Sequence, residues 1–408
     1  MAKVLLAWEL GAGKGHLVNL LPLAQGLRAH GHRLFLALRD LAHAQTVFRG
    51  LGAAYLQSPY KAGPPRTPIF VPRSFAHLLY NVGFGDPPEL EVLVAAWRNL
   101  FEMIDPDLIV FEHSPTALLA ARGCRARKVV LGNGFLCPPD STPWPDLRPW
   151  MPPDAEVIVR GEELVLKNVN EVLRLAGQPP LERLAQLYAE VDDVLLTTVA
   201  EFDPYEDRSG ARYRGPWLPT GGETPTWPAG HGPRIYAYLK SFPALPQLLT
   251  LLRQRGHPTI VSCDGLPPAL LLRHAAANVR FETRRLDLGR IAAECDAAVL
   301  NGNHATTLTM LLAGKPFLQF PLVLEQELNA RATACLGAGV MVPPNPPNQP
   351  SPPNPPAQMV RALDDLLHQD AYGRAAQRFA TRYAGHDPQE ESRQAAAHLE
   401  ALLAAGGG

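Results

Sequence analysis

The feature that most constrains the fold is a repeated alternation of short apolar runs with stretches of helical periodicity. Runs at 4–8, 33–38 and 107–111 have the length and character of strands buried on both faces of a parallel sheet. Because helical stretches separate them, the order is βαβα, which requires a parallel sheet with right-handed crossovers. The alternation starts again near residue 234, after a segment rich in proline and glycine.

A chain of 408 residues exceeds the size at which one hydrophobic core stops growing, so the two series indicate two domains. We predict an α/β protein with two Rossmann-like domains. The expected boundaries are an N-terminal domain at 1–215, a linker at 216–232, a C-terminal domain at 233–382 and a last helix at 383–408, for which we consider a return to the N-terminal domain. The proline-rich stretch 343–356 is expected to be a lengthened surface loop.

Charge and cysteine content exclude several classes of partner. The formal net charge of -1 gives no basic surface for nucleic acid. The five cysteines include no CxxC pair, so neither a structural zinc site nor a disulfide framework is expected. No apolar run reaches transmembrane length and no signal-peptide pattern opens the chain, so we expect a cytoplasmic protein. The oligomeric state is left open.

A glycine-rich turn follows the first apolar run. Gly11, Gly13 and Gly15 alternate with other residues and lead into His16 at the start of a helix. Alternate glycines let a backbone turn sharply and approach a ligand. The spacing matches neither a dinucleotide fingerprint nor a phosphate-binding Walker motif, so the turn alone predicts no particular ligand.

A second turn of small and polar residues follows the apolar run 297–300. It is expected to continue to a helix beginning near Thr307 and ending at Gly314. Free backbone N–H groups and the helix dipole favour an anion at such a place. The candidate phosphate-binding residues of this turn are Asn301, Gly302, Asn303, His304, Thr306 and Thr307.

Other polar residues are predicted at the carboxyl ends of strands. They are His16, Glu112, Lys240, Ser241, Glu325 and Gln326. Ligands of open α/β sheets bind beyond these ends, at the point where the strand order reverses. The two series therefore predict two ligand crevices, one in each domain.

These motifs and their order resemble glycosyltransferases of the GT-B fold, in the UDP-glycosyltransferase superfamily and its macrolide and natural-product branch. The resemblance covers nearly the whole chain. It is carried by Gly15-His16, by the run 106–112, by the turn 301–307 and by Glu325-Gln326. It implies that the N-terminal domain binds the acceptor, that the C-terminal domain binds a nucleotide sugar, and that no other cofactor or metal is used.

By the same resemblance, His16 matches the family's catalytic base and Glu112 its orienting carboxylate. The donor would be held by Lys240, Ser241, the turn 301–307 and the sugar-binding pair Glu325-Gln326. Asn301 stands where the family has histidine, and its amide is expected to reach a phosphate oxygen or the sugar. Ala305 stands where the family has glycine. The alanine side chain restricts φ and the approach of the backbone to a ligand.

Two proline-rich, aromatic stretches, 60–91 and 135–154, are long for connections in such sheets, and long loops tend to be functional. We expect them to form an apolar wall for the acceptor, through Phe70, Tyr80, Phe84, Phe135 and Trp144.

The resemblance implies inverting, metal-independent transfer from a UDP- or dTDP-sugar to a hydroxyl of a small, partly apolar acceptor. Two alternatives stay open. One is a UDP-sugar epimerase of the same fold, against which the His16–Glu112 pair argues. The other is a non-catalytic binding protein or partner subunit, which the departures at Asn301 and Ala305 favour.

Overall fold

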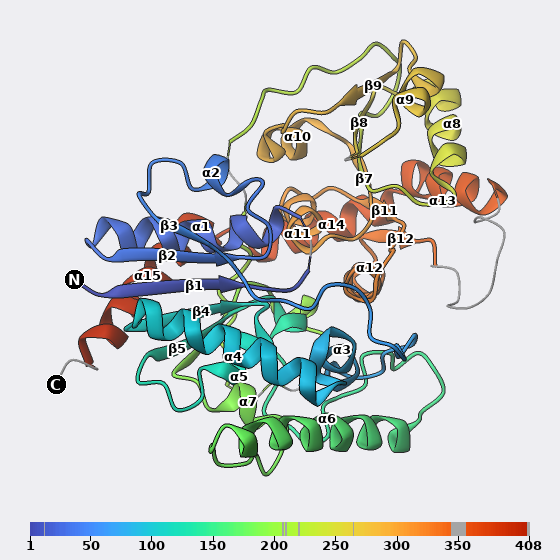
Figure 1. Cartoon of the computed structure of the whole chain (residues 1–408). Coiled ribbons are helices and arrows are strands. Elements are labelled where there is room, and N and C mark those ends of the chain that lie inside the picture. Colours follow the sequence, from blue (N-terminus) through green and yellow to red (C-terminus); the bar gives the residue numbers. More distant parts are fainter. Residues whose placement is uncertain are drawn as a thin grey trace. The chain divides into compact units, whose positions relative to one another are not determined.

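The computed structural model describes residues 1–405 except 12, 206–207, 209, 219–220, 264 and 344–355. The chain forms two compact units (Figure 1). Unit 1 comprises Met1–Trp217 together with Asp387–Gly408, and unit 2 comprises Leu218–His386. The proline-rich loop expected at 343–356 lies almost entirely outside the described residues.

Unit 1 is built on a six-stranded parallel sheet with the strand order β3-β2-β1-β4-β5-β6. The strand order reverses between β1 and β4, where Trp8 is paired with Glu112. Both of these strands are buried on both faces, as their apolar sequences predict. The strands are β1 (Lys3–Trp8), β2 (Arg33–Leu38), β3 (Ala54–Gln57), β4 (Leu108–Glu112), β5 (Arg127–Gly132) and β6 (Asp193–Leu196).

Helices cover both faces of the unit 1 sheet (Figure 1). One core joins alternate residues of β1 to α1 and to the C-terminal helix α15, and Gly26 lets Ala396 approach α1 closely. The C-terminal helix is thus part of unit 1. The helices are α1 (Gly15–Ala29), α2 (Ala44–Val47), α3 (Phe75–Leu79), α4 (Pro87–Ile104), α5 (Pro115–Ala120), α6 (Ala155–Leu175), α7 (Gln186–Ala189) and α15 (Pro388–Ala405), with short helical turns at Tyr80–Phe84, Gly134–Leu136 and Ala200–Phe202.

Unit 2 repeats this plan with the strand order β12-β11-β10-β7-β8-β9. The order reverses between β7 and β10, which are paired in parallel. The strands are β7 (Ile235–Leu239), β8 (Thr259–Cys263), β9 (Val279–Glu282), β10 (Ala297–Leu300), β11 (Phe317–Gln319) and β12 (Gly339–Met341). The helices are α8 (Leu245–Arg255), α9 (Pro268–His274), α10 (Leu288–Glu294), α11 (His304–Leu312), α12 (Leu324–Cys335), α13 (Pro356–His368) and α14 (Asp370–Arg382).

The predicted fold class, two α/β units with parallel sheets, is confirmed. Several elements differ from expectation. Helix α11 begins at His304 and not near Thr307, so the turn after β10 is only Asn301–Asn303. Strands β3 and β12 and helix α14 were not predicted. Strand β3 is mostly exposed and lies at the sheet edge, so it lacks the apolar run that marks a buried strand.

Candidate active site

In unit 1, the structure brings His16 and Glu112 into direct contact. His16 lies in the first turn of α1 and Glu112 is the last residue of β4. The Nδ1 of His16 is 2.9 Å from Oε1 and 2.8 Å from Oε2 of the Glu112 carboxylate. The Glu112 side chain has no exposed surface, whereas that of His16 is 16% exposed. A buried carboxylate at Nδ1 favours the tautomer with the proton on that nitrogen, which makes Nε2 the basic one.

Aromatic and glycine residues fix the His16 ring. Trp8, fully buried at the end of β1, stacks on it with ring centroids 5.1 Å apart. On another side lies Gly11, whose φ of +82° is in the left-handed region that favours glycine. A Cβ added at Gly11 would overlap Nε2 and Cε1 of the His16 ring. Gly11 therefore packs its backbone against the ring of the catalytic candidate.

Glu9 is a buried carboxylate that sequence reasoning missed. It follows β1 and is 1% exposed, and it accepts hydrogen bonds from the backbone N–H of Thr116 at 2.8 Å and of Ala117 at 3.1 Å. These are first-turn N–H groups of α5, the helix that follows Glu112. Burial raises the pKa of Glu9 to about 7, although these hydrogen bonds act in the opposite direction. Glu9 thus links the end of β1 to the start of α5, the helix that follows β4.

The aromatic residues predicted to contact the acceptor lie in different environments. Phe84 and Trp144 have no exposed surface, and Phe135 is 8% exposed. Trp144 and Phe135 pack edge-on against Phe75 in an aromatic cluster. We therefore correct the assignment of Phe84 and Trp144, because a fully buried ring cannot contact an acceptor without rearrangement.

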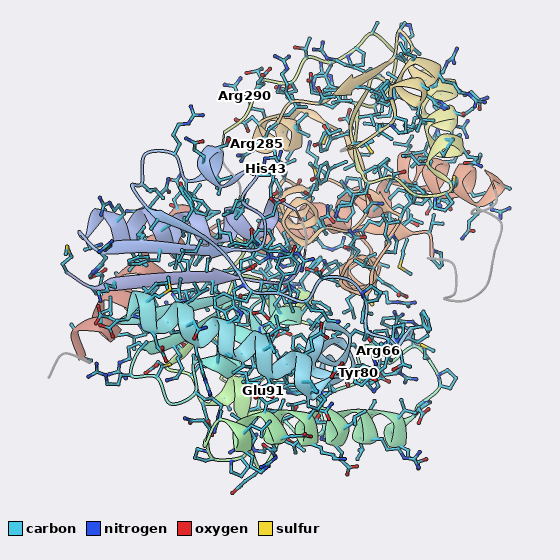
Figure 2. All side chains as sticks on the ribbon, in the orientation of Figure 1. His43, Arg66, Tyr80, Glu91, Arg285 and Arg290 are labelled. Atoms are coloured by element: carbon cyan, nitrogen blue, oxygen red, sulfur yellow. The ribbon has the colours of Figure 1, made fainter. Side chains whose placement is uncertain are left out.

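Phe70 and Tyr80 remain candidates for the acceptor wall. Phe70 is 64% exposed. Tyr80, labelled in Figure 2, is half-buried, and its hydroxyl lies 3.2 Å from Thr67 Oγ1. An exposed aromatic ring can cover an apolar ligand, whereas a core ring is already packed.

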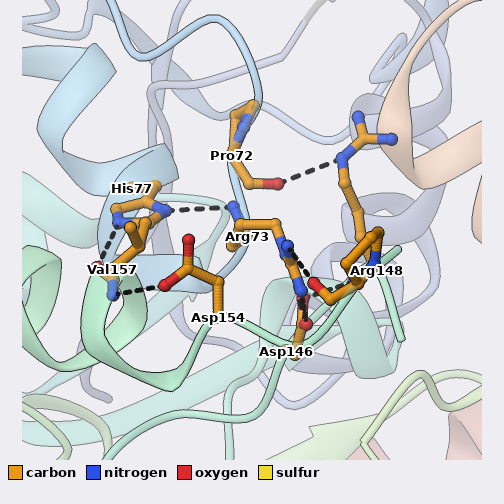
Figure 3. Close-up of polar contacts among 8 residues, drawn as sticks. Pro72, Arg73, His77, Asp146, Arg148, Asp154 and Val157 are labelled. Carbon is orange, nitrogen blue, oxygen red and sulfur yellow. Dashed lines mark hydrogen bonds and ion pairs between the residues drawn. The ribbon is translucent and has the colours of Figure 1, made fainter. Parts of the chain in front are cut away.

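A polar network anchors the two aromatic loops to each other and to α6 (Figure 3). Arg73 forms an ion pair with Asp146, with its Nε 2.9 Å from Oδ1. Its backbone N–H donates to Nδ1 of His77, whose Nε2 donates to the carbonyl of Val157. Burial lowers the pKa of His77, so the ring stays neutral and can accept the Arg73 bond. These contacts link the two loops to each other and to α6.

In unit 2, the Asn301 side chain is a structural clamp. It is 1% exposed; its Oδ1 accepts from the backbone N–H of Lys240 at 2.6 Å, and its Nδ2 donates to the carbonyl of Phe320 at 2.8 Å. The amide thus joins the ends of β7 and β11 across the end of β10. The expectation that it reaches a phosphate or sugar is corrected, because the amide is buried and committed to backbone groups.

Further side-chain amides hold the three-residue turn. Gln326 accepts from Leu322 N–H and donates to Asn303 Oδ1 at 2.6 Å, and Asn329 donates to the carbonyl of Gly302 at 2.9 Å. Gly302 has a φ of +89°, and a Cβ there would meet the Gln326 carbonyl at 2.7 Å. The predicted sugar-binding Gln326 is 5% exposed and is part of this scaffold.

The remaining donor candidates lie at the start of α11 or near it. Thr306 and Thr307 are buried in the first turn, and Thr307 N–H bonds to the carbonyl of Asn303. Burial lowers the pKa of His304, the first residue of α11, to about 4, so its ring is neutral. Lys240 and Ser241 are exposed beyond β7, and Glu325 is half-buried in the first turn of α12.

The described part of the chain holds no group of three or more His, Cys, Asp or Glu side chains arranged for a metal ion. Within the same residues, no helix combines the length and apolar character needed to cross a membrane.

No family model matches the sequence. A stretch of 279 residues is 28% identical to a PGL/p-HBAD biosynthesis glycosyltransferase of Mycobacterium tuberculosis, covering 64% of each chain. A stretch of 271 residues is 27% identical to a PGL/p-HBAD biosynthesis rhamnosyltransferase of Mycobacterium bovis, covering 62% of this chain and 60% of that one. The matches thus span less than two thirds of these relatives.

Solved structures match over nearly the full length. The calicheamicin glycosyltransferase CalG4 has a TM-score of 0.69 at 22% identity, covering 99% of this chain and 98% of its own. SnogD from Streptomyces nogalater has a TM-score of 0.61 at 20% identity, covering 98% and 99%. The expected GT-B fold is confirmed. The chain therefore has the GT-B fold, and part of its sequence is similar to curated glycosyltransferases.

Proposed function

We propose that this chain is a glycosyltransferase that moves a sugar from a UDP- or dTDP-linked donor to a hydroxyl of a small, partly apolar acceptor. The observation that carries the proposal is the contact between His16 and the buried Glu112 carboxylate at the strand-order reversal of unit 1. A general base must stand within reach of the hydroxyl and hold its proton in the transition state, and an imidazole oriented by a carboxylate does both.

The reaction is a single displacement with inversion. The acceptor hydroxyl gives its proton to Nε2 of His16, the oxygen attacks the anomeric carbon, and the nucleoside diphosphate leaves with the bonding electron pair. Glu112 stabilises the imidazolium that forms. General-base help of this kind contributes about 10²–10⁴-fold to the rate.

The donor half of the proposal rests on unit 2. The developing charge of the diphosphate is assigned to the N-terminal N–H groups of α11 and to the exposed Lys240 and Ser241, and no metal is used. Glu325 is assigned to the sugar hydroxyls. The choice of nucleotide is supported by two similar proteins, VinC and the spinosyn rhamnosyltransferase SpnG, whose structures were determined with thymidine diphosphate.

A non-catalytic binding protein is the second candidate. It is favoured by the turn Asn301–Asn303, where the buried amide of Asn301 stands in place of the family's histidine. Such a protein would keep the crevices without turning over a nucleotide sugar.

Nucleotide titration and a turnover assay distinguish the glycosyltransferase from the non-catalytic binding protein. For the first candidate, UDP or dTDP should bind at micromolar concentrations, and the corresponding nucleotide sugar should release free diphosphate when a phenol is added as acceptor. Thr306→Asp should weaken nucleotide binding at least about tenfold, since it places a like charge in the first turn of α11. Its melting temperature without nucleotide is the control, because an acidic residue suits a helix N-terminus. Nucleotide binding without any turnover would favour the second candidate, and no binding to wild type would exclude the first.

A further inference from the structure

The indole of Trp8 covers one face of the His16 ring. The two rings are stacked, with centroids 5.1 Å apart and an interplanar angle of 21°. The Glu112 carboxylate meets the same imidazole at Nδ1, at 2.8 and 2.9 Å. Because a hydrogen bond to a ring nitrogen lies near the plane of the ring, the carboxylate and the indole act on His16 from different directions.

Trp8 is held in place by groups other than His16. It is the last residue of β1, paired with Leu38 of β2 and Glu112 of β4, and it is 1% exposed. Its Nε1–H donates to the carbonyl of Leu10 at 2.5 Å. The N–H of the indole is thus bonded to the turn after β1, and the face of its ring is what meets the imidazole.

The position of His16 in the fold disfavours its charged form. His16 is the second residue of α1, where free N–H groups and the helix dipole place partial positive charge. Its side chain is only 16% exposed, and burial also disfavours a charge. A general base has to carry a proton in the transition state. Neighbouring groups that stabilise the imidazolium therefore strengthen this base.

Titratable and charged groups from several elements surround His16. Glu112, at the end of β4, has the opposite charge and stabilises the imidazolium. The ring of His113 lies 5.8 Å away between centroids, but burial lowers its pKa to about 3, so it is neutral. Lys14, which precedes α1, and Arg39, which acts on the pKa of His113, have the same charge as an imidazolium. An aromatic face stabilises the imidazolium without adding another titratable group.

Building on the proposed function, we propose that Trp8 is a positioning residue that strengthens His16 as a base, because its indole face attracts the imidazolium more than the neutral imidazole. The negative face of an aromatic ring attracts a cation within about 6 Å of the ring centroid, and indole does so most strongly. The stack of 5.1 Å lies within this range. Trp8 acts only through His16: the proton of the acceptor hydroxyl moves to Nε2 of His16, and Trp8 neither gains nor loses one.

The first test is a titration of His16 without any substrate. The thirteen histidines are labelled with carbon-13 at Cε1, and the His16 signal is identified by its loss in His16→Ala. Its NMR shift is then followed between pH 4.5 and pH 9. The midpoint should lie about one pH unit lower in Trp8→Leu, which has no aromatic face, and about half as far below wild type in Trp8→Phe.

Trp97→Leu is the matched control for the loss of a buried indole. Trp97 is also fully buried in unit 1, but it packs against Phe101 of α4. This variant should leave the midpoint of the His16 titration at the wild-type value, even where its melting temperature falls as far as that of Trp8→Leu.

Fluorinated tryptophan separates the charge of the indole face from its packing. Fluorine withdraws electron density from the ring and changes its shape little. When 5-fluorotryptophan or a difluorotryptophan replaces all six tryptophans of the wild-type chain, the midpoint should fall stepwise with the number of fluorines. The same labelling of Trp8→Phe should have no effect, because position 8 then carries no indole. This experiment decides the question even if Trp8→Leu does not fold.

The pH profile of kcat/KM links the titration to the reaction. With 4-chlorophenol and UDP-glucose or dTDP-rhamnose, the acid limb of the profile in Trp8→Leu should move to lower pH by the same amount as the midpoint. The plateau should be lower, because a weaker base takes the proton of the acceptor less readily. A residue that only supported the fold would lower the plateau and leave the acid limb in place.

The outcomes separate this inference from the proposed function. A wild-type midpoint in folded Trp8→Leu overturns the role of Trp8. A midpoint that falls in Trp8→Leu but does not respond to fluorination also overturns it, because Trp8 would then act by packing alone. If the midpoint moves as expected while wild type neither transfers a sugar nor releases nucleotide, the proposed function fails and the effect of Trp8 on His16 stands.

Discussion

The strand-order reversals of the two units have the same topology but opposite chemistry. In unit 1, the residues beyond β1 and β4 are ionisable: Glu9, Glu112, His16 and His113 gather there, mostly buried. In unit 2, Asn301 and Asn303 beyond β10 are neutral amides that bond to backbone groups or to Gln326, and the charged Lys240 beyond β7 is exposed.

This difference indicates a division of labour between similar scaffolds. A buried carboxylate next to an imidazole changes the proton affinity of that imidazole, which suits proton transfer. Amides satisfy backbone groups without titrating, so they fix the shape of a turn whose N–H groups then face an anion. The same α/β crevice can therefore serve catalysis or binding, depending on which polar residues follow its strands.

The largest expected effect is on turnover in unit 1. His16→Ala should lower turnover at least about 10²-fold while nucleotide affinity stays within twofold, because the base acts only on the acceptor. Glu112→Gln should cost less, since an amide oxygen can still accept from Nδ1–H but carries no charge. Steady-state kinetics with nucleotide titration measure both, and near-native turnover in His16→Ala would remove unit 1 from the chemistry.

The second prediction concerns the pH dependence of stability. Folding raises the pKa of Glu9 from its ordinary value of 4.5 to about 7, so the folded state binds the proton more tightly than the unfolded state does. Glu9 therefore favours folding most below pH 4.5, and this advantage is lost as the pH rises to about 7. The loss is about 3 kcal/mol, from 1.36 kcal/mol per pKa unit.

Glu9→Gln cannot titrate and should lack this component. Urea unfolding of wild type and variant between pH 4 and pH 8 measures it as a difference of slopes. Parallel pH profiles of the two proteins would show that Glu9 does not titrate in this range.

The third prediction tests the amide clamp of unit 2. Asn301→Ala leaves the Lys240 N–H and the Phe320 carbonyl unpaired in a buried place, which should cost about 2–4 kcal/mol of unfolding free energy. Asn303→Ala is the matched control, because Asn303 is half-buried and its side chain bonds only to Gln326 among the contacts described. In denaturant unfolding, Asn301→Ala should have a clearly lower free energy of unfolding than Asn303→Ala. Equal losses of unfolding free energy would refute the role of Asn301 as a clamp.

The smallest expected effect distinguishes a steric clash of a new Cβ from backbone strain in the glycine turn. Gly11 and Gly13 both have positive φ, so alanine strains either position, but only at Gly11 would the new Cβ meet other atoms, those of His16. Gly11→Ala should therefore lower turnover about tenfold more than Gly13→Ala, with similar melting temperatures. Equal losses in turnover would mean that the turn acts through its backbone alone.

The sequence determined the repeating α/β plan and the contact between His16 and Glu112. Apolar runs of strand length and helical periodicity are local signals, and the carboxyl ends of β1 and β4 meet wherever these strands are neighbours in a parallel sheet. The pairing of His16 with Glu112, 96 residues apart in the chain, was implied by the family resemblance, and the neighbouring strands β1 and β4 give its structural reason.

Only the tertiary structure decided how each polar or aromatic side chain is used. Asn301 and Gln326 have sequences around them that suit ligand binding, yet neighbouring strand ends supply backbone partners that no local pattern reveals. Trp144 and Phe84 lie in loop-like sequence but are buried, because burial depends on which distant residues pack over a side chain. Glu9 carried no motif, and its raised pKa arises from a desolvation that exists only in the folded chain.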